Sequence, residues 1–303
     1  MTQEFTVSSE IRAALDAGHP TVALETALIT HGFAYPASVK ITLRMAQAIR
    51  RAGALPAVVG IWQGHPVVGL SDPQIEALAQ DNAAGKVSVR DLPLMSVRGS
   101  HGGTTVAATS VLAQRAGLRV FATGGIGGVH RGHPEDVSAD LPVLASTPII
   151  VVCAGAKSLL DLPRTLEYLE TWGVPVVGWQ TEEFPAFYSR ASGLKVDFRA
   201  QEAAQVAAIY AAQRAQSLRQ GLLVTVPVPA ADEVPADEVE PLIAQAVAEA
   251  TAQGVSGKDL TPFILARMVT LSASRTRLAN ESLLVNNAVV AAKIAVALSQ
   301  AAR

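Results

Sequence analysis

Short apolar segments alternate with longer amphipathic segments along most of the chain. The runs Leu118–Ala122, Pro148–Cys153 and Val174–Val177 are apolar almost throughout, which is typical of strands that a parallel sheet buries on both faces. Helix-like segments separate these runs, and Gly117 is a suitable C-terminal stop for the helix before the first of them. Strands that alternate with helices in this way predict a layered α/β fold.

The same periodicities predict the remaining elements. Ala37–Ala52 places its apolar residues on one helical face, whereas Ala57–Trp62 and Val67–Leu70 resemble a pair of strands around a turn. Further strands are expected at Val22–Leu24, Val87–Val89 and Leu222–Val226, and further helices at Pro73–Asn82, Thr104–Ala116, Leu159–Thr171, Gln201–Arg219, 236–252, 261–272 and 280–301. We predict a three-layer α/β/α arrangement with a largely parallel central sheet. Residues 1–303 should form a single domain, because the motifs described below interleave along the chain.

Composition narrows the class of protein. Half of the 303 residues are hydrophobic and the formal net charge is −2, so we expect a large core and no nucleic-acid polymer as partner. No run approaches the roughly 20 apolar residues that cross a bilayer, and the N-terminal segment lacks the pattern of a signal peptide. The one cysteine, Cys153, ends an apolar run and is expected to be a small buried side chain. These features predict a cytoplasmic protein without a membrane segment.

The densest cluster of glycines, Thr123–Gly132, directly follows the strand expected at Leu118–Ala122. Glycines after a strand let backbone amides approach an anion closely, and His130 and Arg131 add charge and hydrogen-bond donors. Ligands of parallel sheets bind beyond the carboxyl ends of the strands. The spacing is neither G-x-G-x-x-G nor that of a P-loop. We therefore favour a ligand-binding loop over a flexible turn, without assigning a nucleotide motif.

A second glycine cluster, Gly99–Thr105, leads into the helix expected from Thr104. Amides at the N-terminus of a helix bind phosphate readily. An ordinary helix cap by Thr104 explains the same residues equally well. Both interpretations stay open on the sequence alone.

The segment after the first glycine loop carries two carboxylates, of Asp136 and Asp140, and the hydroxyl of Ser138. Oxygen ligands of this kind suit magnesium or manganese, and without a Cys/His array in the sequence zinc is not expected. The same residues also suit the start of a helix, with Ser138 or Asp136 as its cap and Asp140 near the positive end of its dipole. Without other context the helix start is favoured.

Two further ionisable residues lie at the ends of apolar segments. Lys157 follows Pro148–Cys153 and is expected to begin a helix. Low dielectric and a helix N-terminus both disfavour an ammonium ion, so the amine should be nucleophilic and able to form imines with sugar aldehydes. Glu25 lies within the apolar stretch Thr21–Ile29. It is either a buried acid with a raised pKa or an exposed carboxylate at a strand end.

Together these clusters resemble the pseudouridine-5′-phosphate glycosidase family, also known as the indigoidine synthase A-like family. The matching stretches run collinearly from about Ala23 to Asn287, and are ALETALITHGFAYP, GKVSVRDLP, GGTTVAATSVLAQRAGLRVFATGGIGGVHRG, DVSADL, PIIVVCAGAKSLLDLPRTLEYLETWGVPVVGW, TEEFPAFYSRASGLKVD and GKDLTPFILARM. Their length and order make the resemblance more specific than any single cluster. It implies an enzyme that reversibly cleaves the carbon–carbon bond between uracil and ribose 5-phosphate in pseudouridine 5′-phosphate.

The resemblance assigns roles to individual residues. It implies that Lys157 of AGAKS is the nucleophile, that Glu25 of ALE is the acid and that Asp136 binds manganese, with one ion per subunit. The residues it implies in substrate contact are Lys86, Val106, Thr123, His130, Ser138, Ala139, Asp140 and, by a looser match, Asn280. It also implies a homotrimer.

The implied chemistry follows from the substrate. A C-nucleoside offers no glycosidic heteroatom to protonate, so the two carboxylates of ordinary glycosidases would not suffice. The resemblance implies that Glu25 assists ring opening and that Lys157 attacks the anomeric carbon, with an imine intermediate when the bond to uracil breaks. The alternative functions are another lysine-imine enzyme acting on sugar phosphates, of the aldolase kind, and a catalytically silent sugar-phosphate-binding protein.

The chain departs from the family pattern at three places. The stretch before Asp136 is about two residues shorter than expected, which could shift the metal site slightly. Valine stands at position 89, where the pattern has arginine, and Val285 precedes Asn286-Asn287 in place of lysine. None of these changes removes a residue with an assigned role.

Overall fold

A large sheet runs through the centre of the computed structural model, which describes residues 5–255, 257 and 260–301. The strands are β1 (Thr6–Val7), β2 (Thr21–Leu24), β3 (Leu55–Trp62), β4 (His65–Val68), β5 (Gly85–Val87), β6 (Gly102–Thr104), β7 (Val120–Ala122), β8 (Val129–His130), β9 (His133–Val137), β10 (Ile150–Cys153), β11 (Leu160–Asp161), β12 (Val176–Trp179), β13 (Phe198–Ala200) and β14 (Leu222–Thr225). The 11-stranded sheet has the order β1-β4-β3-β2-β7-β10-β14-β12-β13, with β6 paired to β3 and β5 paired to β6. Every pair along this order is parallel except β3–β4. A separate antiparallel sheet has the order β11-β8-β9.

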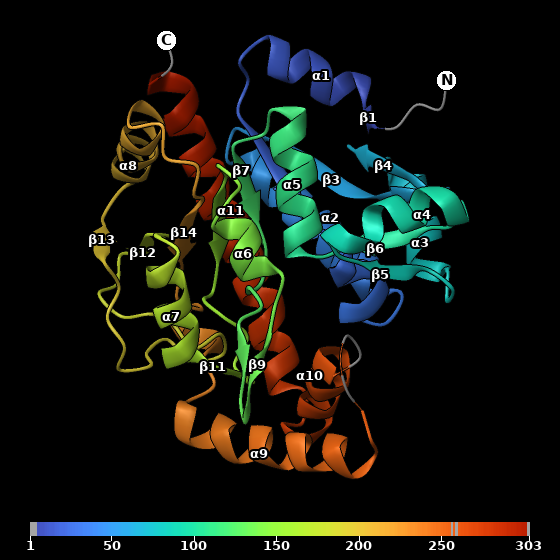
Figure 1. The fold of residues 1–303 in the computed structure, drawn as a ribbon, viewed down its shortest axis with the longest axis vertical. Coiled ribbons are helices and arrows are strands. Elements are labelled where there is room, and N and C mark those ends of the chain that lie inside the picture. The colour runs from blue at the N-terminus through green and yellow to red at the C-terminus, as the bar shows by residue number, and fades with distance from the viewer. Residues whose placement is uncertain (1–4, 256, 258–259, 302–303) are drawn as a thin grey trace.

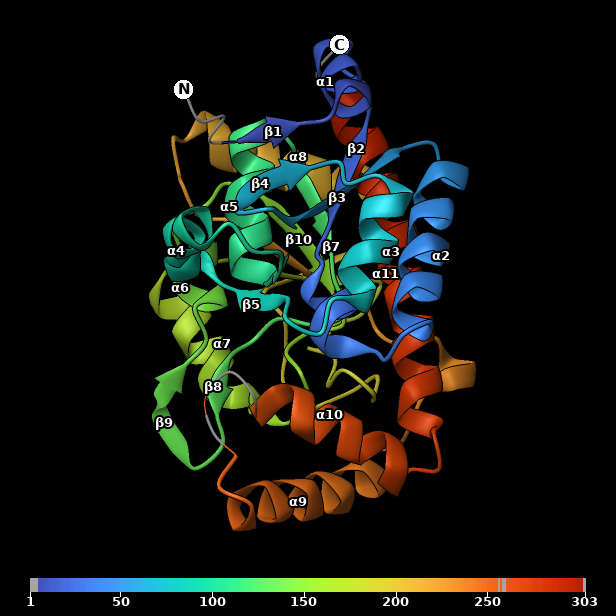
Figure 2. The same cartoon turned by 90° about the vertical axis from the view of Figure 1, so that its right-hand side faces the viewer.

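Helices cover both faces of the large sheet. The helical elements are α1 (Ser9–Asp16), η1 (Leu28–Gly32), α2 (Ala37–Arg51), α3 (Asp72–Gln80), η2 (Val89–Asp91), α4 (Leu92–Arg98), α5 (Val106–Ala116), α6 (Asp140–Leu144), α7 (Leu162–Thr171), α8 (Ala203–Ala215), η3 (Ala230–Asp232), α9 (Ala236–Ala252), α10 (Leu260–Leu271) and α11 (Arg275–Ala301). Helices α2 and α11 pack on one face and α5 on the other (Figure 2). The predicted three-layer α/β/α fold with a largely parallel sheet is therefore confirmed.

The central strands owe their burial to their sequences. All four residues of β10 are fully buried, and its neighbours β7 and β14 are buried as well. Each buried valine or isoleucine of this kind stabilises the fold by about 1.5–3 kcal/mol relative to an exposed one. Cys153 ends β10, and burial raises the pKa of its thiol to about 12. The expectation of an inert, buried cysteine is confirmed.

The last helix, α11, is apolar over a longer stretch than the sequence analysis expected of any segment. Among the described residues, α11 is the one helix that is long and apolar enough, by length and composition alone, to cross a bilayer. The window that meets this criterion is 61% buried inside the protein, and α11 packs against α2, α8, β7 and β10. Its apolar composition is thus explained by its place in the core.

Three predicted boundaries shift for local reasons. The strand expected at Val87–Val89 ends at Val87, because η2 begins at Val89. Thr104 belongs to β6, and the cap of α5 is Thr105, whose hydroxyl accepts a hydrogen bond from the amide of Ala108 at 3.5 Å. The helix expected from Leu159 begins at Leu162, since Leu160 and Asp161 pair with β8 instead.

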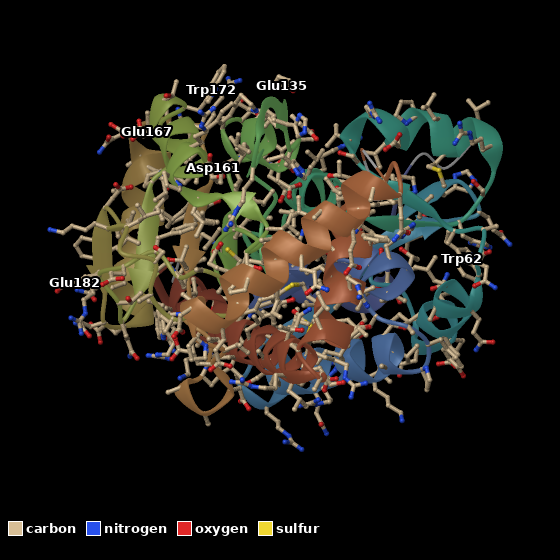
Figure 3. The ribbon with its side chains drawn as sticks, turned by 90° about the horizontal axis from the view of Figure 1, so that it is seen from below. Trp62, Glu135, Asp161, Glu167, Trp172 and Glu182 are labelled. Carbon is tan, nitrogen blue, oxygen red and sulfur yellow. The ribbon has the colours of Figure 1, made fainter. Side chains whose placement is uncertain are left out.

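Helices α9 and α10 pack against each other across one end of the molecule, and we call this pair the cap. Figure 1 shows α9 below β9, β11 and α7, with α10 beside β9, and in the view from below the cap crosses the middle of the molecule (Figure 3). Glu135, in the exposed hairpin strand β9, lies near the edge of that view, away from the cap. The cap therefore lies over the end of the sheet where β2, β7 and β10 terminate, as the cavities described below also show.

Candidate active site

The neighbouring parallel strands β2, β7 and β10 end side by side, and two of them bring polar residues together. Leu24 is in register with Ala122, and Ala122 with Val152. Glu25 and Thr123 are the next residues of their strands, and the Thr123 hydroxyl donates a hydrogen bond to a carboxylate oxygen of Glu25. This corner of the sheet therefore assembles an acid and its hydrogen-bond partner from segments 98 residues apart.

Glu25 is half-buried and paired, which supports the buried-acid interpretation over the exposed one. Burial raises the pKa of Glu25, and the charge of Asp140 adds to this effect. The positive charges of Lys157 and Lys86 and the hydrogen bond from Thr123 act in the opposite direction, but they do not cancel the effect of burial on this pKa. A carboxyl group in this environment keeps its proton to higher pH than an exposed glutamate.

Lys157 lies in the loop between β10 and β11, and not at the start of a helix. The nearest following helix, α7, begins at Leu162, so the predicted contribution of a helix N-terminus is wrong. The loop is instead fixed by its backbone: the Lys157 amide donates to the Ile126 carbonyl at 3.1 Å, and its carbonyl accepts from the Leu160 amide at 3.0 Å. The glycine loop thereby positions the lysine.

The glycine loop lines a cavity, but its amides are largely used within the protein. The amides of Ile126, Gly127 and Val129 donate to the Gly155 carbonyl at 3.1 Å, to Asp140 Oδ2 at 2.7 Å and to Thr165 Oγ1 at 3.1 Å. A Cβ atom at Gly127 would lie 2.2 Å from Ser138 Oγ, and one at Gly125 would lie 2.7 Å from the Phe187 ring. Close packing, rather than a cradle of free amides, therefore explains these glycines.

The two aspartates after the loop have different environments. Asp140 is 5% exposed and accepts hydrogen bonds from the amides of Ala107, in the first turn of α5, and Gly127. Its carboxylate thus occupies one of the amides that the second glycine cluster was expected to offer to phosphate. Asp136 is exposed in β9, so its predicted role as a helix cap is wrong. Ser138 Oγ accepts from the Asp140 amide at 3.2 Å at the start of α6, as the helix-start interpretation expected.

Two adjoining hollows meet at Glu25, Lys86 and Lys157. Both are open to solvent to a similar degree. The first has about 540 Å³ of empty space, and its walls are mostly apolar, with Phe187 and Leu284 among them. The second has about 1360 Å³, and a larger share of its wall is polar. All residues that the resemblance assigned to catalysis, substrate or metal line one or both hollows: Glu25, Lys86, Val106, Thr123, His130, Asp136, Ser138, Ala139, Asp140, Lys157 and Asn280. Residues from much of the chain thus meet around a space large enough for a nucleotide.

The larger hollow is lined by His130 and Asp136, whose charges interact. Burial lowers the pKa of His130, and the charge of Asp136 acts against this shift. Across the described residues, no three His, Cys, Asp or Glu side chains are grouped to hold a metal ion. A divalent ion at Asp136 would therefore need water or a bound phosphate for most of its ligands.

Two residues that the sequence analysis did not assign support this corner. Asn287 in α11 is fully buried, and its Nδ2 donates to the carbonyl of Thr123 at 2.8 Å. Its signal in the sequence is an amide pair, Asn286-Asn287, within the otherwise apolar stretch Leu283–Ala292 of the helix. Phe187 lines the apolar hollow with a positive φ of 64°, which bulky residues rarely adopt outside functional sites.

The geometry agrees with comparisons to known proteins. The model of the family described as "Indigoidine synthase A like protein" matches residues 10–297. The chain belongs to this family. A relative from Methylobacterium nodulans, named pseudouridine-5′-phosphate glycosidase, is 52% identical over 291 residues, which cover 95% of this chain and 86% of the relative. A relative of the same name from Caldanaerobacter subterraneus subsp. tengcongensis is 44% identical and covers 99% of this chain and 98% of its own length.

Solved structures of the family share the fold. The crystal structure of an indigoidine synthase A-like protein from Thermotoga maritima superposes with a TM-score of 0.91 at 37% identity, covering 99% of this chain and 98% of that one. The prealnumycin C-glycosynthase AlnA, solved in complex with ribulose 5-phosphate, also gives 0.91, at 39% identity and with 99% and 100% coverage. The expected family membership is confirmed.

Proposed function

We propose that the protein cleaves the carbon–carbon glycosidic bond of pseudouridine 5′-phosphate and releases uracil and ribose 5-phosphate in a reversible reaction. The observation that carries the proposal is the meeting of Glu25 and Lys157 where the apolar and polar hollows join. The names of the relatives support the substrate, and the complex of AlnA with ribulose 5-phosphate supports a sugar phosphate in this fold.

The shapes of the hollows match the two halves of the substrate. The apolar hollow offers Phe187 and Leu284 to the faces of a flat base, and Asn280 to its polar edge. The polar hollow offers Arg90, with Lys86 at the junction, as cations for a phosphate. The glycosidic bond then lies at the junction of the hollows, beside Lys157.

The bond changes balance with these two groups and one water. Glu25 gives its proton to the ring oxygen as Lys157 Nζ attacks the anomeric carbon, so a C–N bond forms and the C–O ring bond breaks. The new secondary ammonium loses a proton, and C5 of the base takes up a proton. The nitrogen lone pair then forms the imine, and the electron pair of the breaking C–C bond goes to C5, which expels uracil. Water hydrolyses the imine, which frees the lysine and returns a proton to Glu25.

Manganese is proposed as the metal, with Asp136 as its carboxylate ligand from the protein. Carboxylate oxygen suits a hard divalent ion, and one or two carboxylates with substrate phosphate are a common arrangement for such ions. When bound, the ion would supply positive charge to the phosphate. We also propose a homotrimer in the cytoplasm, which light scattering tests directly: the expected mass is three times the 31.5 kDa subunit, and a monomer at micromolar concentration would contradict it.

The test is incubation with pseudouridine 5′-phosphate and Mn²⁺, followed by chromatography of the products. We expect equal amounts of free uracil and ribose 5-phosphate. An aldolase-like enzyme would form an imine with ribose 5-phosphate but would release no uracil. A sugar-phosphate-binding protein would show neither, and either result would overturn the proposal.

A further inference from the structure

Arg131 has a role different from the one its position in the glycine-rich cluster predicted. We expected its charge to serve a ligand, but four hydrogen bonds bind its guanidinium to other parts of the protein. Nε donates to the Leu160 carbonyl at 3.0 Å, and Nη2 donates to the Ser158 carbonyl at 2.8 Å. Nη1 and Nη2 also donate to the two carboxylate oxygens of Glu240 at 2.6 and 3.0 Å.

The two hydrogen bonds from Arg131 to backbone carbonyls hold the loop that carries Lys157. Ser158 and Leu160 follow Lys157 in the chain, and both residues are buried. Their carbonyls would lose these partners without a donor at position 131. Leu160 also pairs with His130 in the small sheet, so Arg131 reinforces a backbone link that already joins the two segments.

The two hydrogen bonds from Arg131 to Glu240 hold the cap. Glu240 belongs to α9, and the cap supplies walls to both hollows: Pro262 and Leu265 line the apolar one, and Thr261 lines both. Figures 1 and 3 show α9 on the outside of this end of the molecule, with α10 closer to the sheet. A fork of two hydrogen bonds between guanidinium and carboxylate fixes direction as well as distance.

We infer that Arg131 is a clamp that couples docking of the α9–α10 cap to the position of the Lys157 loop. Because the same guanidinium binds both parts, the cap closes the hollows most favourably when the lysine loop is in place. Arg131 is thus a positioning residue, and Glu240 is its partner on the cap. This inference deepens the proposed function and rests on it for the role of Lys157.

A second ion pair, within the cap, provides a control for the loss of an ion pair that does not touch the lysine loop. Arg267 and Glu249 also form a two-bond pair, but both belong to the cap, where they join α10 to α9 without touching the lysine loop. Glu249→Gln therefore weakens an ion pair within the cap and leaves the clamp intact.

The experiment combines hydrogen exchange on the unliganded protein with kinetics of uracil release, using Arg131→Lys, Glu240→Gln and Glu249→Gln. Exchange needs no substrate, so it tests the clamp even if the proposed reaction is wrong. Glu240→Gln should raise KM roughly threefold, as expected for an exposed ion pair, and should speed exchange in α9 and, because the coupling is reciprocal, more weakly at 156–161. Arg131→Lys should speed exchange at 156–161 more than Glu240→Gln does and lower kcat by roughly tenfold to a hundredfold, because a lysine cannot form the fork and a small misplacement of the nucleophile is costly.

Two results would overturn the inference. One is Arg131→Lys with wild-type kcat and wild-type exchange at 156–161, which would make the bonds to the loop incidental. The other is Glu249→Gln with the same rise in KM as Glu240→Gln, which would mean that any weakening of the cap has this effect. Arg131→Met, which removes the charge and every donor, should exceed Arg131→Lys in both measurements, and an equal or smaller effect would also contradict a clamp.

Discussion

The corner where β2, β7 and β10 end and the rim formed by β9 and the cap hold their polar groups in different ways. At the corner, backbone groups and buried side chains fix each residue: Asp140 accepts two amides, and Lys157 is bound to the glycine loop by its own amide. At the rim, Asp136 is exposed and one link to the cap is the half-exposed pair of Arg131 and Glu240. The comparison teaches that the residues proposed for covalent chemistry lie where backbone groups and buried side chains hold them, and that the proposed metal ligand and the link to the cap lie on the more exposed part.

Lys157 should give the largest effect, because it is the only group at the corner proposed to form a covalent bond. Lys157→Ala should bind ligand but lose at least about 10³-fold in kcat. Lys157→Arg should fail as well, since a guanidinium keeps the charge but does not lose a proton to attack. Steady-state release of uracil measures both variants. Substantial activity in Lys157→Arg would indicate an electrostatic role instead.

Asp136 and Asp140 lie four residues apart in the chain, but Asp136 belongs to the rim and Asp140 to the corner. Variants of the two therefore test the comparison of corner and rim. Asp140→Ala leaves one buried and one partly buried amide without acceptors and should lower the free energy of unfolding by about 2–5 kcal/mol, whereas Asp136→Ala should change it by less than about 0.5 kcal/mol. Urea unfolding followed by circular dichroism measures both. Equal stabilities for the two variants would remove the distinction between corner and rim.

Metal dependence sharpens the same comparison at the rim. Dialysis against a chelator should abolish turnover, and Mn²⁺ should restore it. Asp136→Ala should need at least roughly tenfold more Mn²⁺ for half-maximal rescue, because its exposed carboxylate is the proposed protein ligand. Full activity of the chelated protein would show that Asp136 has no metal to bind.

The carboxyl group of Glu25 should lower the free energy of unfolding when it is ionised. Its pKa is raised in the folded state, so its contribution to stability is fully present below about pH 4.3, the ordinary glutamate value, and is lost as pH rises through the raised pKa. Glu25→Gln should therefore be inactive in uracil release, yet more stable than the wild type above this window. Thermal unfolding from pH 4 to 8 tests this, and parallel stability curves for the two proteins would contradict it.

Thr123 should give the smallest change, seen as a shift of the pH profile. Its hydrogen bond lowers the pKa of Glu25 against the larger effect of burial. Thr123→Val keeps the shape of the side chain and removes the donor, so the pKa should rise further. The alkaline limb of kcat/KM, where the required proton is lost from Glu25, should move to higher pH. A shift to lower pH, or none, would show that the Thr123 hydroxyl does not stabilise the carboxylate.

Periodicity alone predicted most of the fold, because the central strands are continuous apolar runs and the helices between them are amphipathic. The site residues came from the resemblance, and the structure brings all of them to the two hollows. The sequence could not predict the use of each polar group, since that depends on contacts between distant segments. Arg131 binds the lysine loop and the cap instead of a ligand, and Lys157 precedes a short strand pairing that no local pattern indicates. Asn287 was missed because its partner, the Thr123 carbonyl, is 164 residues away.

The most direct test of the central claim is to locate the covalent intermediate. The protein is incubated with ribose 5-phosphate, reduced with borohydride and digested for mass spectrometry. We predict one stable adduct, on Lys157, and none in Lys157→Ala. Lys86 also lines both hollows, and it is proposed only to contact the substrate. An adduct on Lys86, or no adduct under conditions where uracil is released, would contradict the account.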